Sequence, residues 1–171
     1  WPDVARMALS QSDSYLEVLK LDEDGELPAE QESGYITVSP TDILREVSVF
    51  NITRELYGPT VEFFTQRGYV EGETLFTCAY DWRKSVNLLT PALQACIDQA
   101  LAANPDSTQV DILAHSMGGL LSRYYISDPS NAAYVRRLVT LGTPQLGAPK
   151  ITLALLDSLC FVEVHICLLQ P

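Results

Sequence analysis

The segment around Ser116 constrains the fold of this chain more than any other feature of its sequence. Residues 110–113, of which Val110, Ile112 and Leu113 are apolar, are predicted to form a short buried β-strand. A helix is predicted to follow from Met117 to about Ser127, because Asp128-Pro129 then stops it. Only three residues, 114–116, separate the two elements, so the chain must turn sharply at Ser116.

The turn itself has the sequence Ala-His-Ser-Met-Gly-Gly, residues 114–119. A strand–turn–helix of this kind is typical of a nucleophile elbow, whose central serine has a strained backbone and needs small residues two positions away on either side. Ala114 and Gly118 meet that requirement, with alanine where glycine is usual. Such an elbow exposes the Ser116 hydroxyl and directs the backbone N–H of Met117, at a helix N-terminus, to where an oxyanion would develop. Acyl transfer requires both features.

His115 adjoins Ser116 in the sequence. Its side chain is expected to point away from Ser116 around so sharp a turn. We therefore interpret His115 as a packing or hydrogen-bonding residue rather than as the general base.

Strands and helices alternate through residues 58–150. We predict, in order, a short helix ending at Gly68, a buried strand at 75–80, a helix from the N-cap Thr90 to Asn104-Pro105 with Leu89, Leu93, Cys96 and Ala100 on its apolar face, the strand and helix flanking Ser116, and a strand at 137–141. This alternation predicts an α/β fold with a mostly parallel sheet and helices on both faces.

The remaining segments carry weaker patterns. Residues 1–57 are predicted to be an irregular excursion with short strand candidates at 15–21 and 34–38. Residues 151–171 form an apolar tail interrupted by charged residues, so no transmembrane segment is predicted. We expect the 171 residues to form a single, partial domain.

Charge and cysteine usage exclude several classes of function. The formal net charge is −11, and an acidic surface repels phosphate backbones, so nucleic acid is not expected as a partner. The early acidic run, from Asp22 to Glu32, lacks the ligand spacing of a cation site and is interpreted as a solvated loop. The cysteines show neither zinc-site spacing nor the density of a disulfide scaffold, and they do not indicate a compartment; they are Cys78, Cys96, Cys160 and Cys167.

Three motifs in order resemble the lecithin:cholesterol acyltransferase family and its lipase relatives. They are Tyr-Asp-Trp-Arg at 80–83, the elbow at 114–119, and Leu-Gly-Thr-Pro at 141–144 followed by Gly147. The resemblance covers about residues 57–150. It implies an α/β-hydrolase fold and a serine acyl-enzyme mechanism on lipid or other ester substrates, with peripheral lipid contact, secretion, and no metal or organic cofactor.

The resemblance assigns roles residue by residue. It implies that Ser116 is the nucleophile and that Met117 supplies an oxyanion-hole N–H. It places Asp81 and Arg83 near the substrate entrance; the alternative is a local ion pair, with Trp82 as an anchor. Whether water or an alcohol receives the acyl group is open, and the sequence indicates no oligomeric state.

The rest of a catalytic triad is incomplete in this sequence. The α/β-hydrolase order is serine, acid, histidine, and Asp157 with His165 satisfies it formally. The two are too close together, because acid and base normally follow different strands joined by a crossover of about a dozen residues or more. We therefore expect an internal piece of a longer hydrolase. The competing hypothesis is a catalytically silent relic that acts only as a scaffold or binding domain.

Overall fold

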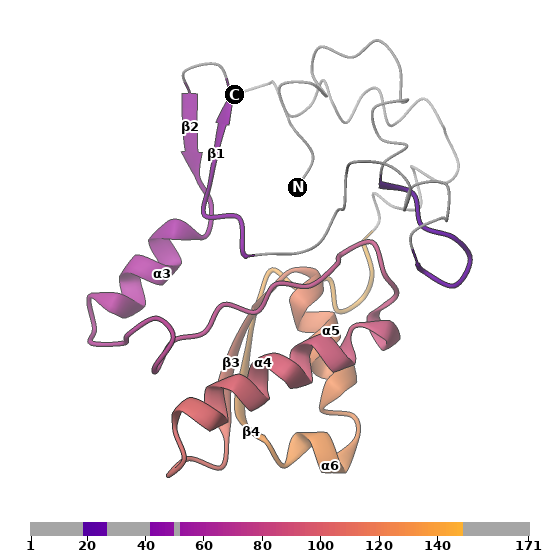
Figure 1. The fold of residues 1–171 in the computed structure, drawn as a ribbon. Helices are drawn as coiled ribbons and strands as arrows, with labels where there is room; N and C mark the ends of the chain where they lie inside the picture. Colours follow the sequence, from indigo (N-terminus) through magenta and orange to yellow (C-terminus); the bar gives the residue numbers. More distant parts are fainter. Residues whose placement is uncertain (1–18, 27–41, 50–51, 149–171) are drawn as a thin grey trace.

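The computed structural model describes residues 19–26, 42–49 and 52–148 (Figure 1). Its elements are strands β1 (Glu46–Val49) and β2 (Ile52–Glu55), helix α3 (Gly58–Thr65), the 3-10 helix η2 (Val86–Leu88), helix α4 (Thr90–Ala103), strand β3 (Val110–His115), helices α5 (Met117–Tyr125) and α6 (Pro129–Ala132), and strand β4 (Val135–Leu141). The strand candidate at 34–38 and the tail at 151–171 lie outside the described residues. Of the candidate at 15–21, only 19–21 are described, and they form no strand.

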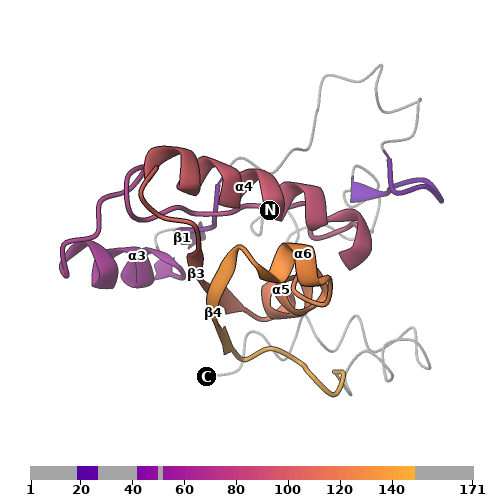
Figure 2. The same ribbon diagram turned by 90° about the horizontal axis from the view of Figure 1, so that it is seen from below.

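Strands β3 and β4 pair in parallel, as predicted. Their register brings His115 opposite Leu141, so both strands end at the same edge. Helix α5 follows β3 directly and packs against both strands. In Figure 2, α3 lies on one side of this pair and α5 with α6 on the other, as predicted for helices on both faces. The described part of the parallel sheet has two strands, fewer than the larger sheet that we expected.

The β3–β4 pair is less covered than predicted. On the face toward α3, the side chains of Leu113 and Leu141 remain 42% and 47% exposed. They form, with residues of α3, an apolar groove of about 460 Å³ lined by Pro59, Thr60, Phe63, Phe64, Leu113 and Leu141. The prediction of a fully buried strand at 110–113 was therefore wrong for the described residues, because α3 covers this face only in part.

The prediction of a strand at 75–80 was also wrong. The described structure has only an isolated bridge between Glu71 and Leu75 there. The Val70 carbonyl accepts hydrogen bonds from the backbone N–H groups of Thr74 and Leu75, at 2.8 and 3.0 Å. These N–H groups are used in a local turn, so they are not available to a sheet partner.

A disulfide joins Cys78 to Cys96, 18 residues apart. It ties the extended segment before residue 80 to the middle of α4. No sequence motif links these two cysteines, so their spacing does not predict the pairing.

Helix α4 starts differently from the prediction. Leu89 occupies the N-cap position, and Thr90 is the first helical residue. The Thr90 hydroxyl donates to the Asn87 carbonyl at 3.3 Å, because the 3-10 turn η2 leads directly into the helix. Pro91 in the first turn and the end at Asn104 are as predicted.

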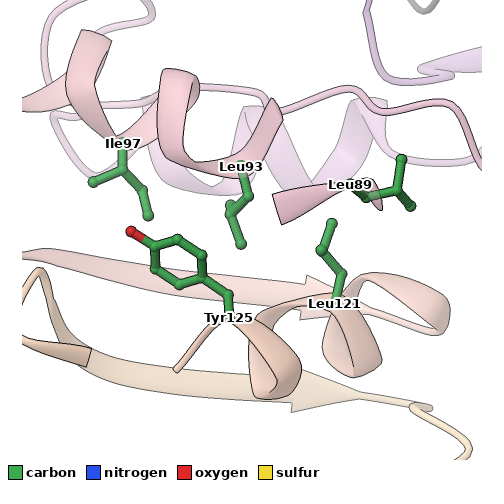
Figure 3. Close-up of a cluster of buried hydrophobic side chains, with 5 residues drawn as sticks. All are labelled: Leu89, Leu93, Ile97, Leu121 and Tyr125. Carbon is green, nitrogen blue, oxygen red and sulfur yellow. The ribbon is translucent and has the colours of Figure 1, made fainter. Parts of the chain in front are cut away.

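The hydrophobic core lies between α4 and α5 (Figure 3). Its buried members are Leu89, Leu93, Ile97, Leu121 and Tyr125. The predicted face included Leu89 and Leu93 but not Ile97. Burying each such side chain contributes about 1.5–3 kcal/mol, and this holds α5 in place against the strands.

Residues 42–57, within the predicted irregular segment, contain an antiparallel hairpin of β1 and β2. The N–H groups of Leu56 and Gly58 donate to the Arg45 carbonyl at 2.8 and 3.1 Å. These bonds close the hairpin onto the start of α3, which begins at Gly58, the predicted boundary.

Candidate active site

Ser116 has the strained backbone predicted for the turn between β3 and α5. Its φ is 52° and its ψ is −123°, and among the described residues it is the one non-glycine residue with positive φ. Such a conformation costs of order 1–3 kcal/mol and persists only where surrounding contacts hold it. The Ser116 N–H donates to the Leu141 carbonyl at 2.9 Å, and the Ser116 carbonyl accepts from Gly119 N–H at 3.1 Å. These bonds attach the turn to both β4 and α5.

Small residues let the helix approach the strand at this turn. A Cβ placed on Gly118 would lie 3.9 Å from the Cβ of Ala114, which is ordinary van der Waals contact. The same position is 3.5 Å from the hydroxyl of Tyr80. Gly118 therefore lies between the strand and a tyrosine ring, and a larger side chain would displace one of them.

The first turn of α5 presents backbone N–H groups beside Ser116. Met117 is its first residue, and the Ser116 N-cap makes no side-chain cap hydrogen bond. N–H groups at the start of a helix generally have no intrahelical acceptor and carry partial positive charge, although here the N–H of Gly119 donates to the Ser116 carbonyl. This end of α5 can therefore accept an anionic oxygen next to a serine hydroxyl.

His115 has the hydrogen-bonding role that the sequence predicted. Its Nδ1 lies 2.8 Å from the hydroxyl of Tyr57, and the two rings meet edge to face with centroids 5.6 Å apart. Tyr57 is the N-cap residue of α3. The contact therefore joins α3 to the residue that precedes Ser116.

Asp81 and Arg83 bind each other. The guanidinium Nε and Nη2 donate to the two carboxylate oxygens at 2.7 and 2.6 Å, with side chains only 5% (Arg83) and 15% (Asp81) exposed. These hydrogen bonds lower the pKa of Asp81 below its usual value. The geometry is that of the local ion pair considered as the alternative to a substrate-entrance role. Trp82 is 44% exposed.

The comparison with known proteins adds to this geometry. Residues 7–161 match the lecithin:cholesterol acyltransferase family. The chain belongs to this family. The match extends beyond residues 57–150, which carried the resemblance in sequence. The family implies an α/β-hydrolase fold, and the parallel β3–β4 pair with its flanking helices is consistent with that fold.

Curated relatives within the family are phospholipases and acyltransferases by name. The chain is 34% identical to phospholipase A(1) LCAT3 of Arabidopsis thaliana over 108 residues, which are 60% of this chain and 24% of that protein. It is 35% identical to the lysosomal phospholipase A and acyltransferase of Homo sapiens over 106 residues, 57% of this chain and 24% of that protein. The matched region thus spans about a quarter of these relatives. No solved structure matches the chain.

Two tyrosines at this family member's turn were missed by sequence reasoning. In the sequence Tyr80 stands out only as part of a motif, yet its hydroxyl lies against Gly118, and burial, with a smaller effect of Tyr57, raises its pKa. Tyr57 was noted only as the start of the resemblance. Neither has a signal in the local sequence pattern, because each reaches the turn from a distant segment.

Other predicted site residues fall elsewhere. Asp157 and His165 lie outside the described residues. Within residues 19–26, 42–49 and 52–148, no group of three or more histidine, cysteine, aspartate or glutamate side chains could hold a metal ion. Among these same residues no helix has the length and apolar character to cross a membrane.

Proposed function

We propose that the protein to which this chain belongs transfers acyl groups from lipid esters through an acyl-enzyme on Ser116. The backbone of Ser116 carries the proposal. Its positive φ stores strain where the end of β3 meets the N-terminus of α5, and strain of this kind in a non-glycine residue is concentrated at functional sites.

The reaction has two steps. The Ser116 Oγ bonds to the ester carbonyl carbon while its proton passes to a histidine, and the Met117 N–H donates to the oxygen that becomes negative. The carbon–oxygen bond to the leaving alcohol then breaks, and the alcohol takes that proton. In the second step, water or another alcohol attacks the acyl-enzyme by the reverse route and releases Ser116.

The activating histidine and acid come, in this proposal, from outside the described residues. His115 is occupied by Tyr57 and precedes the nucleophile. Asp157 and His165 are the pair that this sequence offers; a pair elsewhere in a longer protein is the arrangement that the spacing favours. The names of the relatives support a phospholipid or similar lipid ester as the acyl donor.

The test is intact-mass analysis of the folded chain after reaction with a lipid-like fluorophosphonate. The probe requires an activated serine and a formed oxyanion site. We expect one adduct that is absent from Ser116→Ala and, if Asp157 and His165 act, strongly reduced in His165→Ala. An adduct that persists in Ser116→Ala contradicts the assignment. A folded chain with no adduct would mean that the activity requires the longer protein and that this chain alone is a scaffold with a silent serine.

A second measurement, on protein that reacts with the fluorophosphonate probe, distinguishes hydrolysis from acyl transfer. Phospholipid vesicles with and without a long-chain alcohol are incubated with the protein, and the products are separated. Free fatty acid alone indicates that water receives the acyl group; a new ester at the expense of fatty acid indicates transfer.

A further inference from the structure

We propose that Tyr57 is a positioning residue for Ser116 and that it acts through His115. The inference rests on the proposed role of Ser116. The observation that carries it is the 2.8 Å contact between the Tyr57 hydroxyl and His115 Nδ1, made between residues 58 positions apart. Tyr57 does not act on the reacting atoms; it holds the strand end from which the serine projects.

Backbone hydrogen bonds hold Tyr57 in place at both its N–H and its carbonyl group. The Tyr57 N–H donates to the Leu44 carbonyl at 3.2 Å, at the base of the hairpin. The Tyr57 carbonyl accepts from the N–H groups of Thr60 and Val61, each at 3.1 Å, at the start of α3. The hydroxyl therefore occupies a position set by two elements rather than by a free loop.

The imidazole of His115 also lies near the loop that follows β4. A Cβ placed on Gly142 would lie 3.7 Å from His115 Nε2, which is ordinary van der Waals distance. His115 is paired with Leu141 in the sheet, and Leu141 also accepts the hydrogen bond from Ser116 N–H. His115 is exposed, and it is joined to Tyr57 through its ring and to β4 through its backbone, one residue before the strained serine.

The strain at Ser116 gives a reason for the hydrogen bond between Tyr57 and the His115 ring. The conformation of Ser116 is unfavourable on its own, so it must be imposed by its neighbours. Rotation of the His115 ring would let the end of β3 relax and would move the Ser116 hydroxyl. Small displacements of a nucleophile lower reaction rates steeply, by about 100-fold for 1 Å.

Four single variants of the folded chain test the inference. Tyr57→Phe removes the hydroxyl, and His115→Gln places its amide near Nε2 and leaves the Nδ1 position empty. His115→Asn retains an acceptor, its Oδ1, at the Nδ1 position. The matched control is Tyr69→Phe, because Tyr69 follows α3 and its ring contacts Phe64 of that helix, with centroids 5.3 Å apart.

The first readout is the rate constant for fluorophosphonate labelling. We expect a fall of about 10-fold in Tyr57→Phe and His115→Gln, within the range for a displaced nucleophile. His115→Asn should stay within about threefold of the wild type, and Tyr69→Phe should be unchanged. Equal losses in His115→Asn and His115→Gln would overturn the inference, because a merely structural role does not distinguish them.

The second readout does not depend on reactivity. The backbone amide NMR signals of Ser116 and Met117 should shift in Tyr57→Phe and not in Tyr69→Phe. If the wild type is not labelled, the proposed function fails while these signals still decide whether Tyr57 positions the turn. Unmoved signals in Tyr57→Phe would overturn the inference whatever the labelling rate.

Discussion

The side chain of Thr143 fills the space that a side chain at residue 119 would need. A Cβ placed on Gly119 would overlap Thr143 Oγ1 and would lie 2.8 Å from Thr143 Cβ and Cγ2. Thr143 Oγ1 is itself buried and, within the described residues, has no hydrogen-bond partner. The second glycine of the turn is therefore required by the loop after β4, and two motifs that are separate in sequence form one contact.

Gly119→Ala is expected to destabilise the protein by about 2–3 kcal/mol, because the added methyl overlaps Thr143. Thr143→Gly should relieve most of that loss, whereas Thr143→Ala should not, since its Cβ would still lie 2.8 Å away. Urea denaturation of the single and double variants measures the coupling. Additive losses in Gly119→Ala/Thr143→Gly would show that the two residues do not clash.

Ser116→Gly is expected to be more stable than Ser116→Ala by about 1 kcal/mol. Glycine adopts positive φ without steric cost, which removes strain of about 1–3 kcal/mol and offsets its greater entropy when unfolded. Alanine keeps the Cβ and so keeps the strain. Thermal and urea unfolding of both variants provide the comparison; equal stabilities would mean that residue 116 is not strained.

Loss of the Cys78–Cys96 disulfide should cost about 3 kcal/mol, the chain-entropy value for a loop of this length. Cys78→Ser and Cys96→Ser should each cost nearly as much as the double variant, because either one breaks the bond. Unfolding free energies under non-reducing conditions measure this. If the two single losses add up in the double variant, the cysteines are not paired.

Asp81→Asn should destabilise the folded chain by roughly 2 kcal/mol at neutral pH, the value of hydrogen bonds to a charged group. The folded pKa of Asp81 is lowered, so the unfolded state binds the proton more readily. The contribution of the pair is therefore complete above about pH 4 and is lost as the pH falls through the folded pKa. Urea denaturation at several pH values should show that the difference in unfolding free energy between Asp81→Asn and the wild type decreases at acid pH. A difference that does not change with pH would contradict the Asp81–Arg83 ion pair.

Two adjacent leucines before α4 offer a matched test of the core. Leu89 is 2% exposed and Leu88 is 46% exposed. Leu89→Ala should cost about 2–5 kcal/mol, because it leaves a cavity beside Leu121 and Tyr125, and Leu88→Ala should cost under about 1 kcal/mol. Similar losses in the two variants would place the core elsewhere.

Local patterns predicted the part of the fold nearest Ser116. The signals are local: three apolar residues within 110–113, small residues at 114 and 118, and Pro129 after the helix. They predicted the strand, the strained turn, the helix and the parallel pairing with β4, all of which the structure has. The three motifs likewise indicated the family to which the chain belongs.

Long-range packing decided what the patterns left open or misassigned. Residues 75–80 have an apolar pattern, but whether they form a strand depends on which segment lies beside them. The first backbone N–H of the segment, that of Leu75, donates within a local turn. In the same way, Asp81 and Arg83 could face a substrate or each other until their geometry showed a two-point ion pair.

The sequence by itself determined the strand–turn–helix at Ser116, because propensity, residue size and hydrophobic period are properties of neighbouring residues. Only the tertiary structure decided that Tyr57 meets His115, that Cys78 pairs with Cys96, and that Thr143 requires glycine at 119. The physical reason is that each of these contacts joins segments whose approach depends on the packing of several elements at once, and no local pattern specifies that packing.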